Sequence, residues 1–299
     1  TEIYTLSLHD ALPISLAAFG LPLGVPAGEA PGATPEGGWM RVMFDADLPG
    51  GLRHGADQLR RLSLLVRDRL STDMSRLLSS LGDPLLRRPS PDVPEPALAL
   101  PLLNQLLVHL AAVHGLANEN VTRAQSWRFL DLGHRVERAL MLATLLDRAL
   151  GAADPHDTGL LDTLLDVGDS GITYRSRYNL VPHLAAVLDL LMLDDRNPRS
   201  LLFQFNAIAG HFAQLPGADQ GALPRPAERL LIGTLAALRL ADPTKVSRGQ
   251  PRRAALRAVL RDVAAALPRL SDQLALEYFA HATIARAGTG ESASLPGTL

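Results

Sequence analysis

The chain has 299 residues, and 47% of them are hydrophobic, which is enough for a real core and excludes disorder throughout. Its formal charge of -2 excludes a global field that would recruit nucleic acid or an anionic membrane. The lack of cysteine removes disulfides, thiolate zinc sites and a cysteine nucleophile, and it suits a cytoplasmic protein. Only 4% of residues are aromatic, so Leu, Ala and Val must fill the interior, which favours helix-on-helix packing.

The beginning of the chain does not read as part of a fold. Residues 1–15, TEIYTLSLHDALPIS, resemble the conceptual translation of a sequencing adapter, so native sequence is expected to begin near Leu16 and to be truncated at its N-terminus. Residues 16–38 are dense in Gly, Pro and Ala without a sustained period, which predicts a loop-rich remnant. At the other end, the small and polar residues 287–299 predict a flexible tail.

From Arg53 onward the sequence is a series of helical patterns separated by glycine and proline. The first pattern predicts one helix that ends at Gly82. Its apolar stripe is formed by residues at steps of three and four, namely Leu59, Leu62, Val66, Leu70, Met74 and Leu77.

A second helix is expected at about 98–117, and it is apolar enough to be compared with a membrane span. Its polar or helix-disturbing residues include Pro101, Asn104, His109 and His114. Because each polar group would need a partner in lipid, we interpret this segment as a buried core helix and expect no membrane association.

Seven further helices complete the prediction. Asn197 and Pro198 are interpreted as the N-cap and first-turn residue of one of them. The predicted ranges are 122–151, 160–167, 181–195, 198–215, 224–241, 251–266 and 269–286. Because no alternating strand pattern competes, the sequence predicts an all-α fold, a multi-helix bundle of about eight to ten helices in a single domain over residues 39–286.

The helix at 122–151 carries an unusual number of charges for its length. Five apolar residues share the face that we expect to pack inward, namely Phe129, Leu132, Val136, Leu140 and Ala143. Asp131 and Arg135 are four apart, and we expect them to form an ordinary exposed pair. Glu137 borders the predicted core beside Gly133, where a small residue would admit a neighbouring helix.

Glu137 has no Lys or Arg at helical spacing that could neutralise it, so its cation must come from elsewhere in the fold. The candidates are Arg175, Arg177, Arg196 and Arg199. Two hypotheses remain open for this carboxylate. It forms an interhelix ion pair that fixes the register of the bundle, or it is a ligand-binding or catalytic group.

The usual enzyme motifs are absent from the sequence. There is no phosphate loop, no nucleophile elbow and no H-E-x-x-H zinc helix, so we expect no metal and no cofactor. Three isolated histidines, His183, His211 and His281, are expected to be hydrogen-bonded in the core. For Asp194 and Asp195 a helix-capping role is preferred over Mg²⁺ binding. The arginine-rich residues 248–262 lack stacking aromatics, so we predict a solvated helix face and not a nucleic-acid site.

Residues 122–139, TRAQSWRFLDLGHRVERA, resemble a signature of the bacterial alpha-E domain family that runs approximately T-R-x-x-x-W-R-F-L-D-L-G-R-R-x-E-R-A. ITYRSRY at 172–178 and LDLLMLDDRNPRSLLFQF at 188–205 support the resemblance, which covers roughly residues 40–286. His134 stands where the pattern usually has a basic residue. The usual first segment of the family is absent, consistent with truncation.

The resemblance implies an all-helical domain of unproven function, fused to or acting with circularly permuted ATP-grasp ligases or transglutaminase-like proteins. On this basis the chain is expected to be an accessory or binding module for a peptide or amino-acid-like ligand. A structural scaffold for protein–protein interaction and an enzyme with a Glu/Arg polar site are the alternatives. The residues implicated in ligand binding are Trp127, Arg128, Asp131, Arg135, Glu137, Arg138, Tyr174, Arg175, Arg177, Tyr178, Asp194, Asp195, Asn197 and Arg199.

Overall fold

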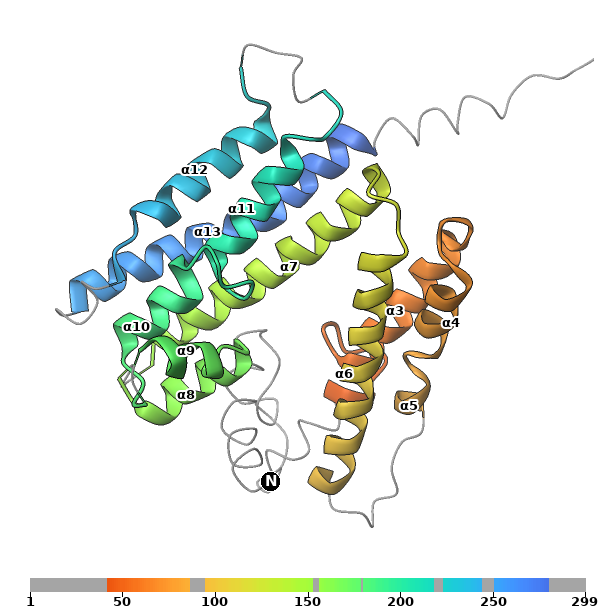
Figure 1. Ribbon diagram of the computed structural model, residues 1–299, viewed down its shortest axis with the longest axis horizontal. Helices are drawn as coiled ribbons and strands as arrows, with labels where there is room; N and C mark the ends of the chain where they lie inside the picture. The colour runs from red at the N-terminus through yellow and green to blue at the C-terminus, as the bar shows by residue number, and fades with distance from the viewer. Residues whose placement is uncertain are drawn as a thin grey trace, which may run out of the picture. The chain divides into compact units, whose positions relative to one another are not determined.

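The computed structural model shows a chain whose regular structure is helical throughout its described part (Figure 1). The described residues are 42–86, 95–152, 156–178, 180–217, 223–243 and 250–279. They contain no strand, which confirms the all-α prediction. The predicted loop at 16–38 and the tail at 287–299 lie outside them. The helices divide into two compact units, one up to Arg128 and the other from Phe129 onward.

The first unit consists of α3 (Leu52–Leu65), a 3₁₀ turn (Arg67–Arg69), α4 (Thr72–Ser80), α5 (Asp83–Leu86) and α6 (Glu95–Glu119). Its core is a small cluster of Ala56, Leu81, Leu85 and Leu106, with Phe44 packed against it.

The single helix predicted up to Gly82 is wrong, because the chain turns between α3 and α4. Leu70 has an extended backbone, and the Ser71 hydroxyl caps α4 by accepting a hydrogen bond from the backbone N–H of Met74 at 3.2 Å. The apolar stripe is therefore broken. Met74 is buried, but Leu59 and Leu62 on α3 are 42% and 55% exposed.

The prediction that the second helix is buried in the core is also wrong. Of the side chains described on α6, only Leu106 is buried, whereas Leu107 and Val108 are 64% and 67% exposed. The sequence of α6 has no consistently polar face, so the side that is covered could not be identified from it. Residues 99–119 are long and apolar enough to cross a membrane by length and composition alone, a property that core helices and signal sequences share.

The second unit contains the remaining helices. The first of them, α7, begins a few residues before the boundary between the units. They are α7 (Gln125–Leu150), α8 (Thr158–Val167), α9 (Gly171–Arg177), α10 (Leu184–Leu188) continuing into a π-helical turn (Asp189–Leu193), α11 (Leu201–Phe212), α12 (Pro226–Leu240) and α13 (Gln250–Tyr278). Figure 1 shows α11 and α13 beside α7, with α12 against α11 and α13.

Contacts between side chains fix the directions of the long helices. Arg135 on α7 meets Gln204 on α11, and Asp131, one turn earlier on α7, meets His211 two turns later on α11. These two helices are therefore antiparallel. The core between the helices is mainly aliphatic, as the composition predicted, with a few buried aromatic residues such as Tyr174 and Phe205.

The two helices predicted at 251–266 and 269–286 form one helix, α13, which contains Pro268 in its interior. Pro268 is exposed, while Leu267 and Leu270 beside it are fully buried. A proline removes one backbone hydrogen bond and usually ends or kinks a helix. Here the burial of leucines on both sides of Pro268 offsets that loss, which a local reading of the sequence could not show.

Candidate functional site

The charged face of α7 contains the most buried acid of the described residues. Asp131 is 8% exposed, and its Oδ2 accepts hydrogen bonds from Arg135 Nε at 3.2 Å and from His211 Nε2 at 2.7 Å. The predicted exposed pair of Asp131 and Arg135 is therefore wrong, because α11 covers it. The prediction that His211 is a hydrogen-bonded core histidine is confirmed.

The pKa of Asp131 reflects this arrangement. Burial by itself raises the pKa, but the hydrogen bond from His211 and the charge and hydrogen bond of Arg135 outweigh it. The pKa consequently lies below its ordinary value of 3.8, and the carboxylate is ionised near neutral pH.

Arg135 connects this carboxylate to the loop before α11. Its Nη1 donates to Gln204 Oε1 at 3.3 Å, and Gln204 Nε2 donates to the carbonyl of Pro198 at 2.6 Å. Gln204 is fully buried, so its amide specifies the position of the loop and does not contact solvent. The guanidinium of Arg135 also lies over the ring of Phe203, 5.5 Å from the centroid.

Glu137 lies on a different side of α7 from Asp131. It is exposed, and it forms no ion pair with any residue in the described part of the chain. Gly133 is exposed as well, and a Cβ built there would meet nothing within 4 Å. The prediction that Glu137 borders the core at a close helix approach is therefore wrong, and the structure gives no support to its register ion pair.

A cluster of predicted residues forms between α9 and the segment after α10. Tyr174 is fully buried, its hydroxyl accepts a hydrogen bond from the backbone N–H of His183 at 2.9 Å, and its ring stacks on that of Tyr178. The hydroxyl of Tyr178 donates to Asp189 Oδ2 at 2.7 Å. Burial, this hydrogen bond and the charges of Asp189 and Asp194 raise the pKa of Tyr178 to about 12. Arg177 pairs with Asp194, which closes the cluster.

Asn197 is not the N-cap of α11, contrary to the prediction. The N-cap is Ser200, whose hydroxyl accepts from the backbone N–H of Phe203 at 3.1 Å. Asn197 is buried, and its amide donates to Ser170 Oγ at 3.1 Å and to the carbonyl of Leu190 at 3.0 Å. Sequence reasoning placed the cap three residues early because Asn-Pro is also a typical start of a helix.

Arg199 and Asp169 connect this loop to the turn between α8 and α9. Asp169 has a φ of 44°, a left-handed conformation that Asn and Asp tolerate better than most residues, and its carboxylate accepts from Arg199 Nη2 at 2.5 Å. The preceding Gly168 is buried. A Cβ on it would lie 2.8 Å from Leu191 Cδ2 and 3.0 Å from the carbonyl oxygen of Leu164.

Replacing Gly168 with Ala is expected to lower the free energy of unfolding by roughly 1–3 kcal/mol, because the added methyl group overlaps a packed leucine and a backbone oxygen. The matched control is Gly133→Ala in the open part of α7, where we expect a gain of about 0.5–1 kcal/mol from helix propensity. Urea unfolding of both variants measures the difference. Equal effects of the two substitutions would contradict the packing described around Gly168.

Arg138 completes the group of predicted arginines on α7. Burial and the charges of Arg199 and Arg135 lower the pKa of Arg138, and Asp169 partly opposes this. Arg138, Arg135 and Arg199 are therefore electrostatic neighbours, although they come from sequence segments about 60 residues apart. Arg138 makes no hydrogen bond or ion pair with any residue that the structure describes.

Like Glu137, four further predicted residues are not part of these networks. Trp127 and Arg128 belong to the first unit, and the guanidinium of Arg123 lies 4.0 Å from the centroid of the Trp127 ring. Arg175 is exposed on α9, where its charge acts on Asp162. Asp195 is exposed in the turn after α10. Asp194 occupies the residue position that ends the π-helical turn, as the predicted capping role requires. Its side chain does not cap the turn, because its carboxylate pairs with Arg177.

The arginine-rich start of α13 is more than a solvated face. Arg257 Nε donates to Asp147 Oδ1 at 2.7 Å, and Arg261 Nε lies 3.2 Å from Asp147 Oδ2. Asp147 is on α7, so these arginines join two long helices. The prediction of a solvated face therefore holds for Arg261, which is exposed, but is wrong for Arg257, which is half-buried. Arg253 is half-buried as well.

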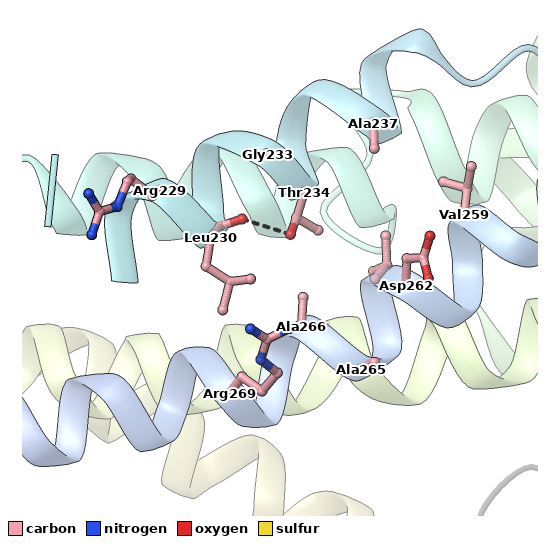
Figure 2. A pocket seen from close by; sticks show the side chains of 11 residues that line it. Arg229, Leu230, Gly233, Thr234, Ala237, Val259, Asp262, Ala265, Ala266 and Arg269 are labelled. Carbon is pink, nitrogen blue, oxygen red and sulfur yellow. Dashed lines mark hydrogen bonds between the residues drawn. The ribbon is translucent and has the colours of Figure 1, made fainter. Parts of the chain in front are cut away.

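A groove of about 370 Å³ lies between α12 and α13, and the sequence analysis did not find it (Figure 2). Small side chains such as Gly233 and Ala265 open it, while Arg229, Arg269 and Asp262 lie along its rim. None of the predicted binding residues lines it. Among the described residues, no three His, Asp or Glu side chains gather in a way that could hold a metal ion.

One family model matches most of the chain. A family described as Alpha-E, "a predicted alpha-helical domain with a conserved ER motif", matches residues 8–279. The Glu–Arg pair occurs here at Glu137–Arg138 and at Glu228–Arg229. In the first pair Glu137 is exposed while Arg138 is half-buried, with a pKa lowered by burial and by the charges of Arg199 and Arg135. In the second pair Glu228 pairs with Arg225 at 2.6 Å.

Similar curated proteins include uncharacterised proteins of Mycobacterium bovis and Mycobacterium tuberculosis, which are 25% identical to this chain over 282 residues. The alignment covers 89% of this chain but only 31% of each relative, so the chain spans less than a third of the proteins it matches. No solved structure matches it. Because the family match extends over most of its length, the chain belongs to the Alpha-E family.

Proposed function

We propose that this chain is a helical accessory module that binds a peptide or amino-acid-like ligand and acts with an ATP-grasp ligase or a transglutaminase-like protein in peptide synthesis or modification. Two observations support it. Three sequence segments bring charged residues together around α7, and the chain corresponds to only part of much longer relatives. A module within a longer protein would act on the substrate of its neighbours.

The observation that carries the proposal is the pair Glu137 and Arg138. The carboxylate of Glu137 is exposed, and the guanidinium of Arg138 has no partner among the described residues. A carboxylate binds an amine, and a planar guanidinium binds a carboxylate through two parallel hydrogen bonds. A peptide or amino acid carries both groups, so these two side chains match the two charged ends of such a ligand.

The test is a binding titration with dipeptides. We expect dipeptides with free ends to bind, and we expect Glu137→Gln to weaken binding by about fivefold or more, since an amine loses one charge-assisted partner. Acetylating the dipeptide amine should remove the difference between wild type and variant. The control is Glu119→Gln, which changes another exposed glutamate that makes no ion pair in the described part of the chain.

Unchanged binding in a folded Glu137→Gln protein would contradict the proposed role of Glu137. Failure of all free dipeptides to bind at millimolar concentration would contradict the peptide-binding function itself.

A structural scaffold is the second candidate, and a specific observation favours it. Several of the predicted binding residues already have partners within the protein. Arg177 pairs with Asp194, Arg199 pairs with Asp169, and Asp131 is bound by two side chains. Such pairs hold helices and loops in register without any ligand. The scaffold function predicts that substitutions in these pairs change stability and leave ligand binding unaffected.

A further inference from the structure

We propose that Arg135, Arg138 and Arg199 form a binding site for an anionic oxygen group, a phosphate or a carboxylate, and that Arg138 contacts the anion directly. This inference rests on the proposed function, because it names the charged group by which the ligand is held. It goes further in assigning separate roles to the three arginines. Arg135 and Arg199 are held in place by the protein, and Arg138 is left for the ligand.

The positions of the three arginines follow from contacts on both sides. Arg135 and Arg138 are three residues apart on α7, so their side chains leave the helix on neighbouring positions of one face. Arg135 reaches Gln204, and Gln204 holds the carbonyl of Pro198, the residue directly before Arg199. This chain of hydrogen bonds places the Arg199 loop against the same face of α7.

Two of the three guanidinium groups have protein partners. Arg135 is bound to the carboxylate of Asp131 and the amide of Gln204, and Arg199 is bound to Asp169. Arg138 is half-buried but has no acceptor among the residues that the structure describes. None of its nitrogens is a fully buried atom without a hydrogen bond, so its N–H groups remain accessible from solvent. An anion can therefore reach donors that the protein does not satisfy.

The electrostatic environment favours a bound anion. Burial and two positive neighbours lower the pKa of Arg138, which means that the surroundings disfavour its charged form. Guanidinium groups stay protonated in proteins, so this cost persists in the free protein. A phosphate or carboxylate beside Arg138 would offset the burial of the charge and the repulsion between the arginines.

The competing explanation is that water alone solvates Arg138 and that the three arginines only support the fold. Removing a positive charge and removing a negative charge from the site distinguish the two explanations, because anion binding should respond to them in opposite directions. Arg138→Gln removes the donor that contacts the anion, whereas Asp169→Asn removes a negative charge that competes with the anion. Asparagine tolerates the left-handed backbone at position 169, so the turn is kept.

The experiment is a calorimetric titration of the intact chain with inorganic phosphate and, separately, with acetate, at constant ionic strength set with chloride. We expect saturable binding that Arg138→Gln weakens by about tenfold or more, as for the loss of one charged hydrogen-bonding pair. Asp169→Asn is expected to strengthen binding by about two- to fivefold. Arg148→Gln, an exposed arginine on the same helix, serves as the control and is expected to change nothing.

Binding that is equal in wild type, Arg138→Gln and Asp169→Asn would overturn the site, as would the absence of saturable binding by either anion. A preference for phosphate identifies a phosphoryl group as the ligand, and a preference for acetate identifies a carboxylate. If the anions bind at Arg138 while no dipeptide binds, the site stands and the peptide-binding function fails. If dipeptides bind with no effect of Arg138→Gln, peptide binding stands, but this site fails and so does the part assigned to Arg138 in holding the peptide.

Discussion

Replacing Asp131 with Asn is expected to lower the free energy of unfolding by about 3 kcal/mol, the lower end of the cost of breaking a buried ion pair from one side. Asp131 is only 8% exposed and is bound by Arg135 and His211, so its neutralisation leaves a half-buried guanidinium without its counter-charge. Urea unfolding at neutral pH measures the loss. The control Asp73→Asn removes one partner of an exposed pair with Arg76 and should cost less than about 0.5 kcal/mol.

The same carboxylate makes stability depend on pH in a defined direction. The pKa of Asp131 in the folded protein lies below its ordinary value of 3.8. Its contribution to stability is therefore complete above that ordinary value and is lost as the pH falls through the folded value. The stability difference between wild type and Asp131→Asn should shrink on acidification below about pH 4. A difference that stays constant down to pH 2 would contradict this assignment.

Replacing Asn197 with Ala is expected to cost about 2–3 kcal/mol of unfolding free energy, because it leaves the buried carbonyl of Leu190 and the hydroxyl of Ser170 without their donor. The substitution also removes the acceptor of the backbone N–H of Arg199, which donates a hydrogen bond to Asn197 Oδ1 at 3.0 Å. We therefore expect weaker phosphate or acetate binding in the same variant. Thermal unfolding and the anion titration measure the two effects.

The control for this prediction is Asn118→Ala on α6. Asn118 also donates its amide to a backbone carbonyl, that of His114, but it does so near the surface. We expect a change within about 0.5 kcal/mol. A comparable loss in both variants would show that the buried position of Asn197 adds nothing, and it would contradict the role assigned to the loop that carries Arg199.

The helical fold and the inward face of α7 were predictable, because helix periodicity depends on neighbours three and four residues apart. Leu132, Val136 and Ala143 are buried as that period indicates. Pro268 could not be placed in the same way. Its position within α13 depends on leucines that are buried against other helices, and no local pattern contains that information.

The sequence indicated which residues belong to the candidate site better than it indicated how they are arranged. The resemblance brought together Arg135, Arg138 and Arg199, and the structure places them as electrostatic neighbours. The sequence could not show that Asp131 is buried. Two opposite charges four residues apart form the same sequence pattern on an exposed helix face and on a face that another helix covers. For Glu137 the error was the reverse, since no packed neighbour exists where Gly133 was expected to admit one.

The groove between α12 and α13 left no signal in the sequence. Its small residues, such as Gly233 and Ala265, occur on two successive helices, and each reads alone as a surface position. Their meeting is a property of the packing between the helices. The same holds for Asp147, which receives Arg257 and Arg261 from a helix more than 100 residues later.

The most direct test of the account is an NMR titration of the arginine Nε–Hε resonances with phosphate and acetate, with the Arg138 signal assigned through Arg138→Lys. We expect a saturable shift of the Arg138 resonance, a smaller shift of the Arg199 resonance, and no shift of the Arg148 resonance, since Arg148 is exposed on the same helix. Shifts that are linear in anion concentration and equal for Arg138 and Arg148 would contradict it. In that case the arginines around α7 would have a structural role only.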